Sequence, residues 1–160
     1  SDGALTSERG LRATYYSAKD FNGDKKVIER VDRQVDFDFG ERTPDAQHFP
    51  TNQFSMQWHG SLIADETGEY EFILKTLNGT RLWVNDDDEP LIDAWVASGQ
   101  SSEHKATIRL IGGRTYPIRV NFFKFKDKNA AISLQWKPPH GTQQPIPNRN
   151  LSPVNVTPTL

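Results

Sequence analysis

The sequence predicts an all-β protein with the architecture of an antiparallel β-sandwich. Short runs alternate between apolar and polar residues, which is the period-two pattern of a strand buried on one face. Turn-forming residues separate these runs at regular intervals, and no segment carries sustained helical periodicity. Eight or more short strands with this spacing are typical of two packed antiparallel sheets.

The N-terminal quarter of the chain predicts two strands and a long loop. Residues 11–16 (LRATYY) form a first apolar run after Gly10, and residues 31–39 (VDRQVDFDF) alternate well enough to predict a further strand. Residues 40–51 contain Gly, Asp and Pro but no alternating run, so we expect a loop there.

The segment between Phe54 and Trp95 is the most informative part of the sequence. Two alternating runs lie on either side of a turn at residues 65–68 (DETG) and have the pattern of half-buried antiparallel strands. The pair Asn78-Gly79 predicts a tight turn, and residues 81–85 (RLWVN) predict the strand that follows it. The alternating apolar residues of the first two strands are Phe54, Met56, Trp58, Tyr70, Phe72 and Leu74.

The C-terminal part predicts three more strands. Residues 104–111 and 116–123 lie on either side of Gly112-Gly113, which is a strong hairpin signal. Residues 131–136 (AISLQW) alternate and end before Pro138-Pro139, and prolines of this kind terminate a strand.

Composition limits the classes of function. The chain has 160 residues, 35% of them hydrophobic, which is enough for one core and one domain. A net charge of −2 supplies no positive field, so we expect no nucleic-acid partner. The absence of cysteine excludes a disulfide framework, a thiolate metal site and a cysteine nucleophile. No apolar run reaches the length of a membrane span, so we expect no membrane insertion.

Both ends of the sequence have the composition of linkers. We therefore expect a linker at residues 1–9, one domain at residues 10–153 and a linker or tail at residues 154–160. This organisation favours a module cut from a longer exported chain. The expected location is extracellular, periplasmic or at the cell surface.

Several long segments, taken together and in order, resemble the anthrax protective-antigen-type β-sandwich domain family over about residues 10–153. They are GLRATYY, FSMQWHGSLIADETGEYEF, TLNGTRLWVN, LIDAW, IRLIGGRTYPIRV, AISLQWKPP and IPNRNLSP. The segments KFKDKNAAISLQWKPPHG and DAW are most similar to the bacterial form found in large exported proteins with c-type cytochrome modules. The resemblance implies carbohydrate or surface recognition rather than catalysis.

The adhesin branch of this family is expected to bind sugar through calcium held by two consecutive aspartates before the strand at residues 81–85. This chain has Leu77-Asn78 at that place. A leucine side chain offers no oxygen, and calcium takes six to eight oxygen ligands. The sequence therefore predicts no calcium site of the adhesin type and no cofactor, although Asn78 could still contact a ligand.

Two other segments are weak candidates for calcium. The acidic run Asp86, Asp87, Asp88 and Glu89 could bind the ion, or it could be a solvated turn between strands. Residues 20–24 (DFNGD) begin like a calcium loop, but Lys25 replaces the turn glycine and Val31 replaces the final acid, which favours an ordinary surface turn.

Aromatic and polar side chains near the strand ends are the candidates for a sugar site. Three tryptophans lie within strand patterns and are predicted to be core or half-buried, whereas Trp95 precedes a polar loop and is predicted to form the partly exposed wall of a shallow site. The loop at residues 124–129 corresponds, by the resemblance, to the second ligand-contacting loop of the adhesins, or is a solubilising turn. The candidate ligand contacts are Asn78, Asp93, Trp95, Lys124, Lys126, Asp127 and Asn129.

These observations favour a non-catalytic carbohydrate-binding module of a larger exported bacterial protein. Its expected partners are a polysaccharide or cell-surface glycan and the other domains of the parent protein. The alternative is a structural or protein-interaction spacer that binds no sugar. A hydrolase ranks last, because the four histidines have no zinc-ligand spacing and no nucleophile or carboxylate pair stands out.

Overall fold

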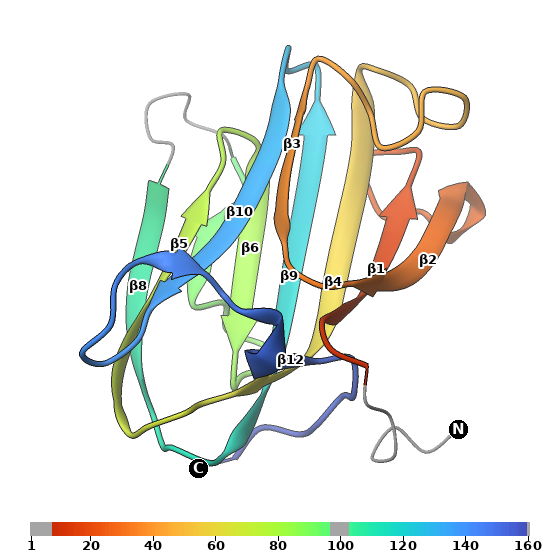
Figure 1. Ribbon diagram of the computed structural model, residues 1–160. Helices are drawn as coiled ribbons and strands as arrows, with labels where there is room; N and C mark the ends of the chain where they lie inside the picture. The colour runs from red at the N-terminus through yellow and green to blue at the C-terminus, as the bar shows by residue number, and fades with distance from the viewer. Residues whose placement is uncertain (1–7, 97–102, 160) are drawn as a thin grey trace.

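A computed structural model describes residues 8–96 and 103–159, and these form two packed antiparallel sheets (Figure 1). The prediction of an antiparallel β-sandwich is therefore confirmed. Only two short 3-10 turns interrupt the strands within the described ranges, η2 (Gly23–Lys25) and η3 (Asn148–Asn150). None of the described helical segments is long and apolar enough to span a membrane.

The first sheet has seven strands in the order β2-β1-β4-β9-β6-β7, with β12 beside β4. Its strands are β1 (Leu11–Tyr16), β2 (Lys26–Asp32), β4 (Gln53–Ile63), β6 (Gly79–Val84), β7 (Ile92–Ala94), β9 (Thr115–Phe125) and β12 (Leu151–Ser152).

The second sheet has five strands in the order β11-β10-β5-β8, with β3 beside β10. Its strands are β3 (Asp36–Gly40), β5 (Gly68–Lys75), β8 (Glu103–Leu110), β10 (Ala130–Lys137) and β11 (Gln144–Pro145).

The core lies between the sheets and contains the alternating residues that the sequence predicted. Phe54, Met56 and Trp58 of β4 are all 0% exposed, because alternate side chains of a strand point to the same face. Trp136 on β10 meets Tyr70 of β5 at a ring-centroid distance of 5.1 Å. The prediction that three tryptophans are buried is confirmed for Trp58, Trp83 and Trp136.

The predicted strand at residues 31–39 is wrong, because the chain changes sheets within it. β2 ends at Asp32 in the first sheet and β3 begins at Asp36 in the second. Val35 lies in the connection, is 2% exposed, and accepts a hydrogen bond from Leu134 N. Because the buried Val35 continues the period-two pattern across the bend, alternation alone could not reveal that the chain changes sheets there.

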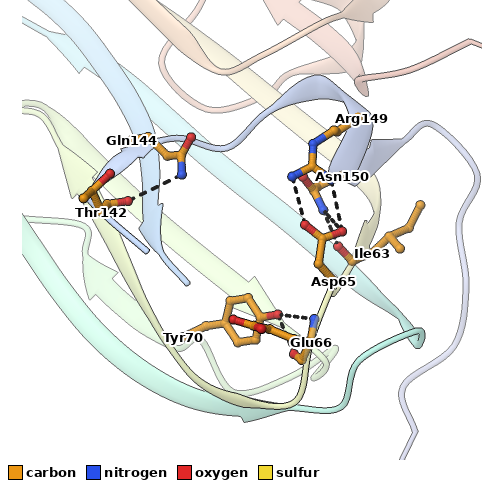
Figure 2. Close-up of polar contacts among 8 residues, drawn as sticks. All are labelled: Ile63, Asp65, Glu66, Tyr70, Thr142, Gln144, Arg149 and Asn150. Carbon is orange, nitrogen blue, oxygen red and sulfur yellow. Dashed lines mark hydrogen bonds and ion pairs between the residues drawn. The ribbon is translucent and has the colours of Figure 1, made fainter. Parts of the chain in front are cut away.

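The C-terminal segment is fastened to the turn between β4 and β5. Arg149 holds both carboxylate oxygens of Asp65, at 3.1 and 3.0 Å, and Asn150 Nδ2 donates to Ile63 O at 2.9 Å (Figure 2). Farther along, the amide of Asn85 exchanges two hydrogen bonds with the backbone of Thr159, at 2.7 and 2.8 Å. Thr159, in the segment expected to be a linker or tail, is thus hydrogen-bonded to the end of β6.

The strand directions gather one set of connections at the upper end of Figure 1. β1, β5 and β9 end there, and β4, β6 and β10 begin there. The connections at residues 17–25, 41–52, 76–78 and 126–129 therefore share this end with Trp95, which follows β7. It is referred to below as the upper end.

Candidate ligand-binding site

Three aromatic side chains meet at the upper end on the outer face of the first sheet. Phe21 lies against Trp95 in a stacked arrangement, with ring centroids 5.8 Å apart, and Phe123 meets Trp95 at 4.6 Å. With Lys19 and Asp20 they line a hollow of about 300 Å³. These five residues are called the aromatic pocket below.

Trp95 is placed by the pairing of β7 with β6. Arg81 is opposite Asp93, and Arg81 Nε donates to Asp93 Oδ1 at 2.9 Å. The same carboxylate oxygen accepts from Trp95 N at 3.2 Å, and the Arg81 guanidinium lies 4.6 Å from the centre of the Trp95 ring. Asp93 therefore orients the tryptophan, and the cation over the ring stabilises it.

Phe123 occupies space that the lack of a side chain at Gly79 provides. The two residues are paired across β6 and β9, and a Cβ at Gly79 would lie 2.0 Å from a carbon of the Phe123 ring. The expectation that Gly79 serves a tight turn is wrong, because Gly79 is the first residue of β6. Glycine within a strand often marks such a close approach.

Phe21 is held in a strained backbone conformation. Its φ of 58° lies in the left-handed region, which is a genuine outlier for a bulky side chain. Phe21 N donates to Ser55 Oγ at 3.2 Å, Ser55 Oγ donates to Ala18 O at 2.6 Å, and Tyr16 packs edge-on against the Phe21 ring. Strain of this kind persists only where the surroundings enforce it, and it clusters at functional sites.

The other predicted site residues form a separate group between the 76–78 and 126–129 connections. Asn78 is 2% exposed, and its Nδ2 donates to Asp127 Oδ2 and to Asn129 O, both at 2.9 Å. Its Oδ1 accepts from Ala131 N at 3.1 Å. The amide of Asn78 thus ties the two connections together, and its polar atoms already have protein partners.

Lys124 is corrected from a candidate ligand contact to an internal residue. Its side chain is buried, with the residue 1% exposed, and Nζ donates to Thr51 O at 2.6 Å. A lysine in this position cannot reach a surface ligand. Lys126, Asp127 and Asn129 remain exposed at the upper end.

The acidic run between β6 and β7 forms a compact turn. Asp86 Oδ1 accepts hydrogen bonds from Glu89 N at 2.9 Å and Asp88 N at 2.8 Å, and these bonds lower the pKa of the Asp86 carboxyl below its usual value. The described residues include no group of three or more metal-ligating side chains. At residues 20–24, Asn22 caps η2 by accepting from Asp24 N.

Residues 7–150 match the model of the PA14 domain. The chain belongs to the PA14 domain family. The two sheets of the sandwich and the ordered segments quoted above agree with this assignment, and the anthrax protective-antigen-type resemblance is related to it.

Similar proteins fall into two groups. The anti-sigma-I factor RsgI3 of Acetivibrio thermocellus is 35% identical over 90% of this chain and 21% of its own length. A solved anti-sigma factor domain-containing protein is 32% identical with a TM-score of 0.83, over 97% of this chain and 51% of that one. The A domain of epithelial adhesin 6 from Candida glabrata, solved in complex with Galβ1-3GlcNAc, shares the fold at 17% identity and a TM-score of 0.73, over 97% of this chain and 92% of that one. This PA14 domain therefore spans about a fifth of the first of these proteins and about half of the second.

The site residues predicted from the sequence did not include Phe21 and Phe123 of the aromatic pocket. The inward alternation of β9 passes through Ile118, Val120 and Phe122, so the adjacent Phe123 must point outward. An apolar ring on a polar face was a readable signal of a surface site. Phe21 gave no such signal, because it lies in a connection and its position depends on its unusual φ.

We expect the thermal unfolding midpoint of this PA14 domain to be the same in millimolar calcium and in EDTA. Asn78 is engaged with Asp127 and Asn129, and Leu77 has no ligand atom, so binding in the adhesin manner would require breaking these bonds. Differential scanning fluorimetry in calcium and in EDTA measures the two unfolding midpoints. A calcium-dependent rise of several degrees would contradict the expectation, and anomalous scattering would then show whether the ion lies at Asn78 or at residues 86–89.

Proposed function

We propose that this PA14 domain is a non-catalytic carbohydrate-binding module and that the aromatic pocket is its site. The observation that carries the proposal is the cluster of Phe21, Trp95 and Phe123, three partly exposed rings around an open hollow. Sugar rings have apolar faces that pack on aromatic side chains, while their hydroxyl groups bond to charged and amide groups. Lys19 and Asp20 line the same hollow and supply a donor and an acceptor.

The similar proteins support this proposal at the level of the family. The epithelial adhesin 6 A domain carries a disaccharide on the same fold. RsgI3 is much longer than this chain, so we propose that the other domains of a larger exported bacterial protein are partners as well. An extracellular, periplasmic or cell-surface location belongs to the same proposal. Neighbouring c-type cytochrome modules stay a prediction.

The hydrogen bonds of Asn78 to Asp127 and Asn129 favour a second candidate function, that of a spacer. The connections that would hold calcium and sugar in an adhesin are joined here by the side chain of Asn78, as a purely structural element would be. The rival is a structural or protein-interaction spacer that binds no sugar. A binding experiment with the wild-type domain separates the two.

We expect Trp95→Ala to abolish most retention on the polysaccharide that the wild-type domain binds. The substitution removes the ring that both Phe21 and Phe123 contact, and a shallow hollow has few other contacts to compensate for its loss. Affinity electrophoresis in gels containing cellulose derivatives, xylan, galactan or polygalacturonate measures retention.

Val96→Ala is the matched control, because Val96 is adjacent and 85% exposed but is not part of the hollow. We expect it to bind like the wild type. Circular dichroism and the unfolding midpoint show whether Trp95→Ala is folded. Full retention by a folded Trp95→Ala would remove the aromatic pocket from the proposal, and a wild type retained by none of the polysaccharides would favour the spacer.

A further inference from the structure

A second hollow lies on the outer face of the first sheet, on the same side as the aromatic pocket. It has a volume of about 350 Å³, and its lining includes Gln57 and His59 of β4, Trp83 of β6, Asp87, Arg119 of β9 and Asn155. These six residues are called the sheet-face pocket below. None of them belongs to the aromatic pocket.

Arg119 is the best-defined group in the sheet-face pocket. Its guanidinium lies 4.0 Å from the centre of the Trp83 ring, which fixes its plane, and Nη2 donates to Asp87 O at 3.3 Å. Arg119 Nε is buried and has no hydrogen-bond partner among the described residues. An unpaired buried donor is costly, so the wall of the sheet-face pocket carries an unsatisfied polar group in the free domain.

The rest of the lining supplies both donors and acceptors. His59 Nδ1 is 2.9 Å from Asn155 Oδ1, which fixes the ring, and Gln57 Nε2 donates to Asn121 Oδ1 at 2.9 Å. Asp87 adds an exposed carboxylate beside the single arginine. With its charges of both signs, this lining matches a neutral polyhydroxyl ligand better than an anionic one.

The two hollows lie along one strand. Phe123 and Arg119 both project outward from β9 and are four residues apart, which is about 13 Å along a strand. Between them lies Asn121, which pairs with Arg81 of β6 and with Gln57 of β4. A strip of amide and guanidinium groups therefore connects the aromatic pocket to the sheet-face pocket over a distance longer than one pyranose ring.

We propose that the sheet-face pocket is a second sugar subsite and that the ligand is a neutral linear polysaccharide lying along β9. This inference rests on the proposed function of the aromatic pocket. It extends the binding surface from the aromatic pocket at the upper end to an internal stretch of a polysaccharide chain. The aromatic pocket supplies the apolar contacts, and Arg119 with its neighbours supplies the polar contacts.

The experiment measures affinity against ligand length. Oligosaccharides of one to six units, prepared from the polysaccharide that retains the wild-type domain, are titrated by calorimetry. We expect the affinity to rise by at least about tenfold once the ligand is long enough to reach both pockets, because the second contact is then intramolecular. Arg119→Gln should remove this rise and leave the affinity for the shortest binding ligand unchanged. Arg109→Gln, on the exposed face of β8 in the other sheet, is the control and should change neither.

An NMR readout follows ligand binding on the wild-type domain itself, and variants are needed only to assign its signals. The indole N–H signals of Trp95 and Trp83 report on the two pockets, and Trp83→Phe and Trp95→Phe spectra assign them. Short oligosaccharides should shift the Trp95 signal, and longer ones should shift both. Asp87→Asn, an exposed substitution, should weaken binding of the long ligands only.

Three outcomes would overturn the inference while leaving the proposed function intact. These are an affinity that does not depend on length, a Trp83 signal that never shifts, and retention of the wild type by polygalacturonate alone. Absence of binding to every polysaccharide and oligosaccharide would overturn the proposed function itself, and the inference with it.

Discussion

Asp32→Ala is expected to lower the free energy of unfolding by about 3–5 kcal/mol, because it leaves two buried hydrogen-bond donors without their acceptor. Asp32 is 6% exposed at the end of β2. Its Oδ2 accepts from Tyr15 Oη at 2.6 Å and from Trp58 Nε1 at 2.9 Å, while Oδ1 accepts from Arg30 Nε at 2.7 Å. Alanine would leave the buried Tyr15 hydroxyl and Trp58 indole N–H without their acceptor, whereas the half-exposed Arg30 guanidinium would still reach water.

Urea denaturation of the wild type and the variant measures the difference. Asp36→Ala is the matched control, since Asp36 is exposed at the start of β3, and its substitution should change the free energy by no more than about 0.5 kcal/mol. A change below about 1 kcal/mol for Asp32→Ala would show that the network contributes little to stability.

The same network gives the domain an alkaline sensitivity. Burial of Tyr15, and then its hydrogen bond to Asp32, raise the pKa of the phenol above its ordinary value of 10. The unfolded chain therefore releases this proton at lower pH than the folded chain, and stability that is complete below pH 10 falls as the pH rises toward the folded value. In Asp32→Ala the decline should begin from a lower stability and its total size should be smaller, because the hydrogen bond and charge of Asp32 no longer raise the pKa of Tyr15.

The sandwich was predictable because alternation records burial directly. A residue such as Met56 is apolar for the same reason that it faces the other sheet, so the pattern and the packing carry one piece of information. The crossing near Val35 was not predictable, since its buried side chain maintains the pattern while the backbone moves from one sheet to the other. Alternation indicates which face of a strand a residue occupies, but it does not indicate to which sheet the strand belongs.

The candidate site was predictable only in part, for reasons specific to each residue. Lys124 follows the inward series that ends at Phe122, so a stricter use of alternation would have predicted its burial. Asn78 could have been a ligand contact or an internal tie, and only the positions of Asp127 and Asn129 in space decide between them. Trp95 was correctly expected to be partly exposed, because it leaves the strand pattern and enters a polar loop.

The aromatic pocket depends on a residue that has no side chain at all. Phe123 lies over Gly79, and the strained Phe21 completes the cluster from a connection about a hundred residues earlier than Phe123 in the chain. A surface that served only as a spacer would have no reason to retain a strained backbone and a strand glycine, both of which cost stability. Their joint presence around one hollow is the strongest argument that the hollow binds a ligand.

Gly79→Ala is expected to abolish polysaccharide retention although it deletes no atom of the binding surface. The new Cβ would lie 2.0 Å from the Phe123 ring, so the ring must rotate away, and the contact with Trp95 that forms the wall of the hollow is lost with it. Overpacking of this kind costs about 1–3 kcal/mol of stability, which a sandwich of this size can tolerate. Affinity electrophoresis gives the retention, and urea denaturation gives the stability.

The double variant Gly79→Ala/Phe123→Ala tests whether the clash with the Phe123 ring causes the effects of Gly79→Ala. Removing the ring abolishes the clash, so the double variant should be more stable than the sum of the two single substitutions implies, by about 1–2 kcal/mol. Retention should not return, because the wall of the hollow is still absent. Strong retention by a folded Gly79→Ala would show that the position of Phe123 is irrelevant to binding. Recovery of retention in the double variant would show that the displaced ring blocks the ligand in Gly79→Ala and that the Phe123 wall is not needed for binding.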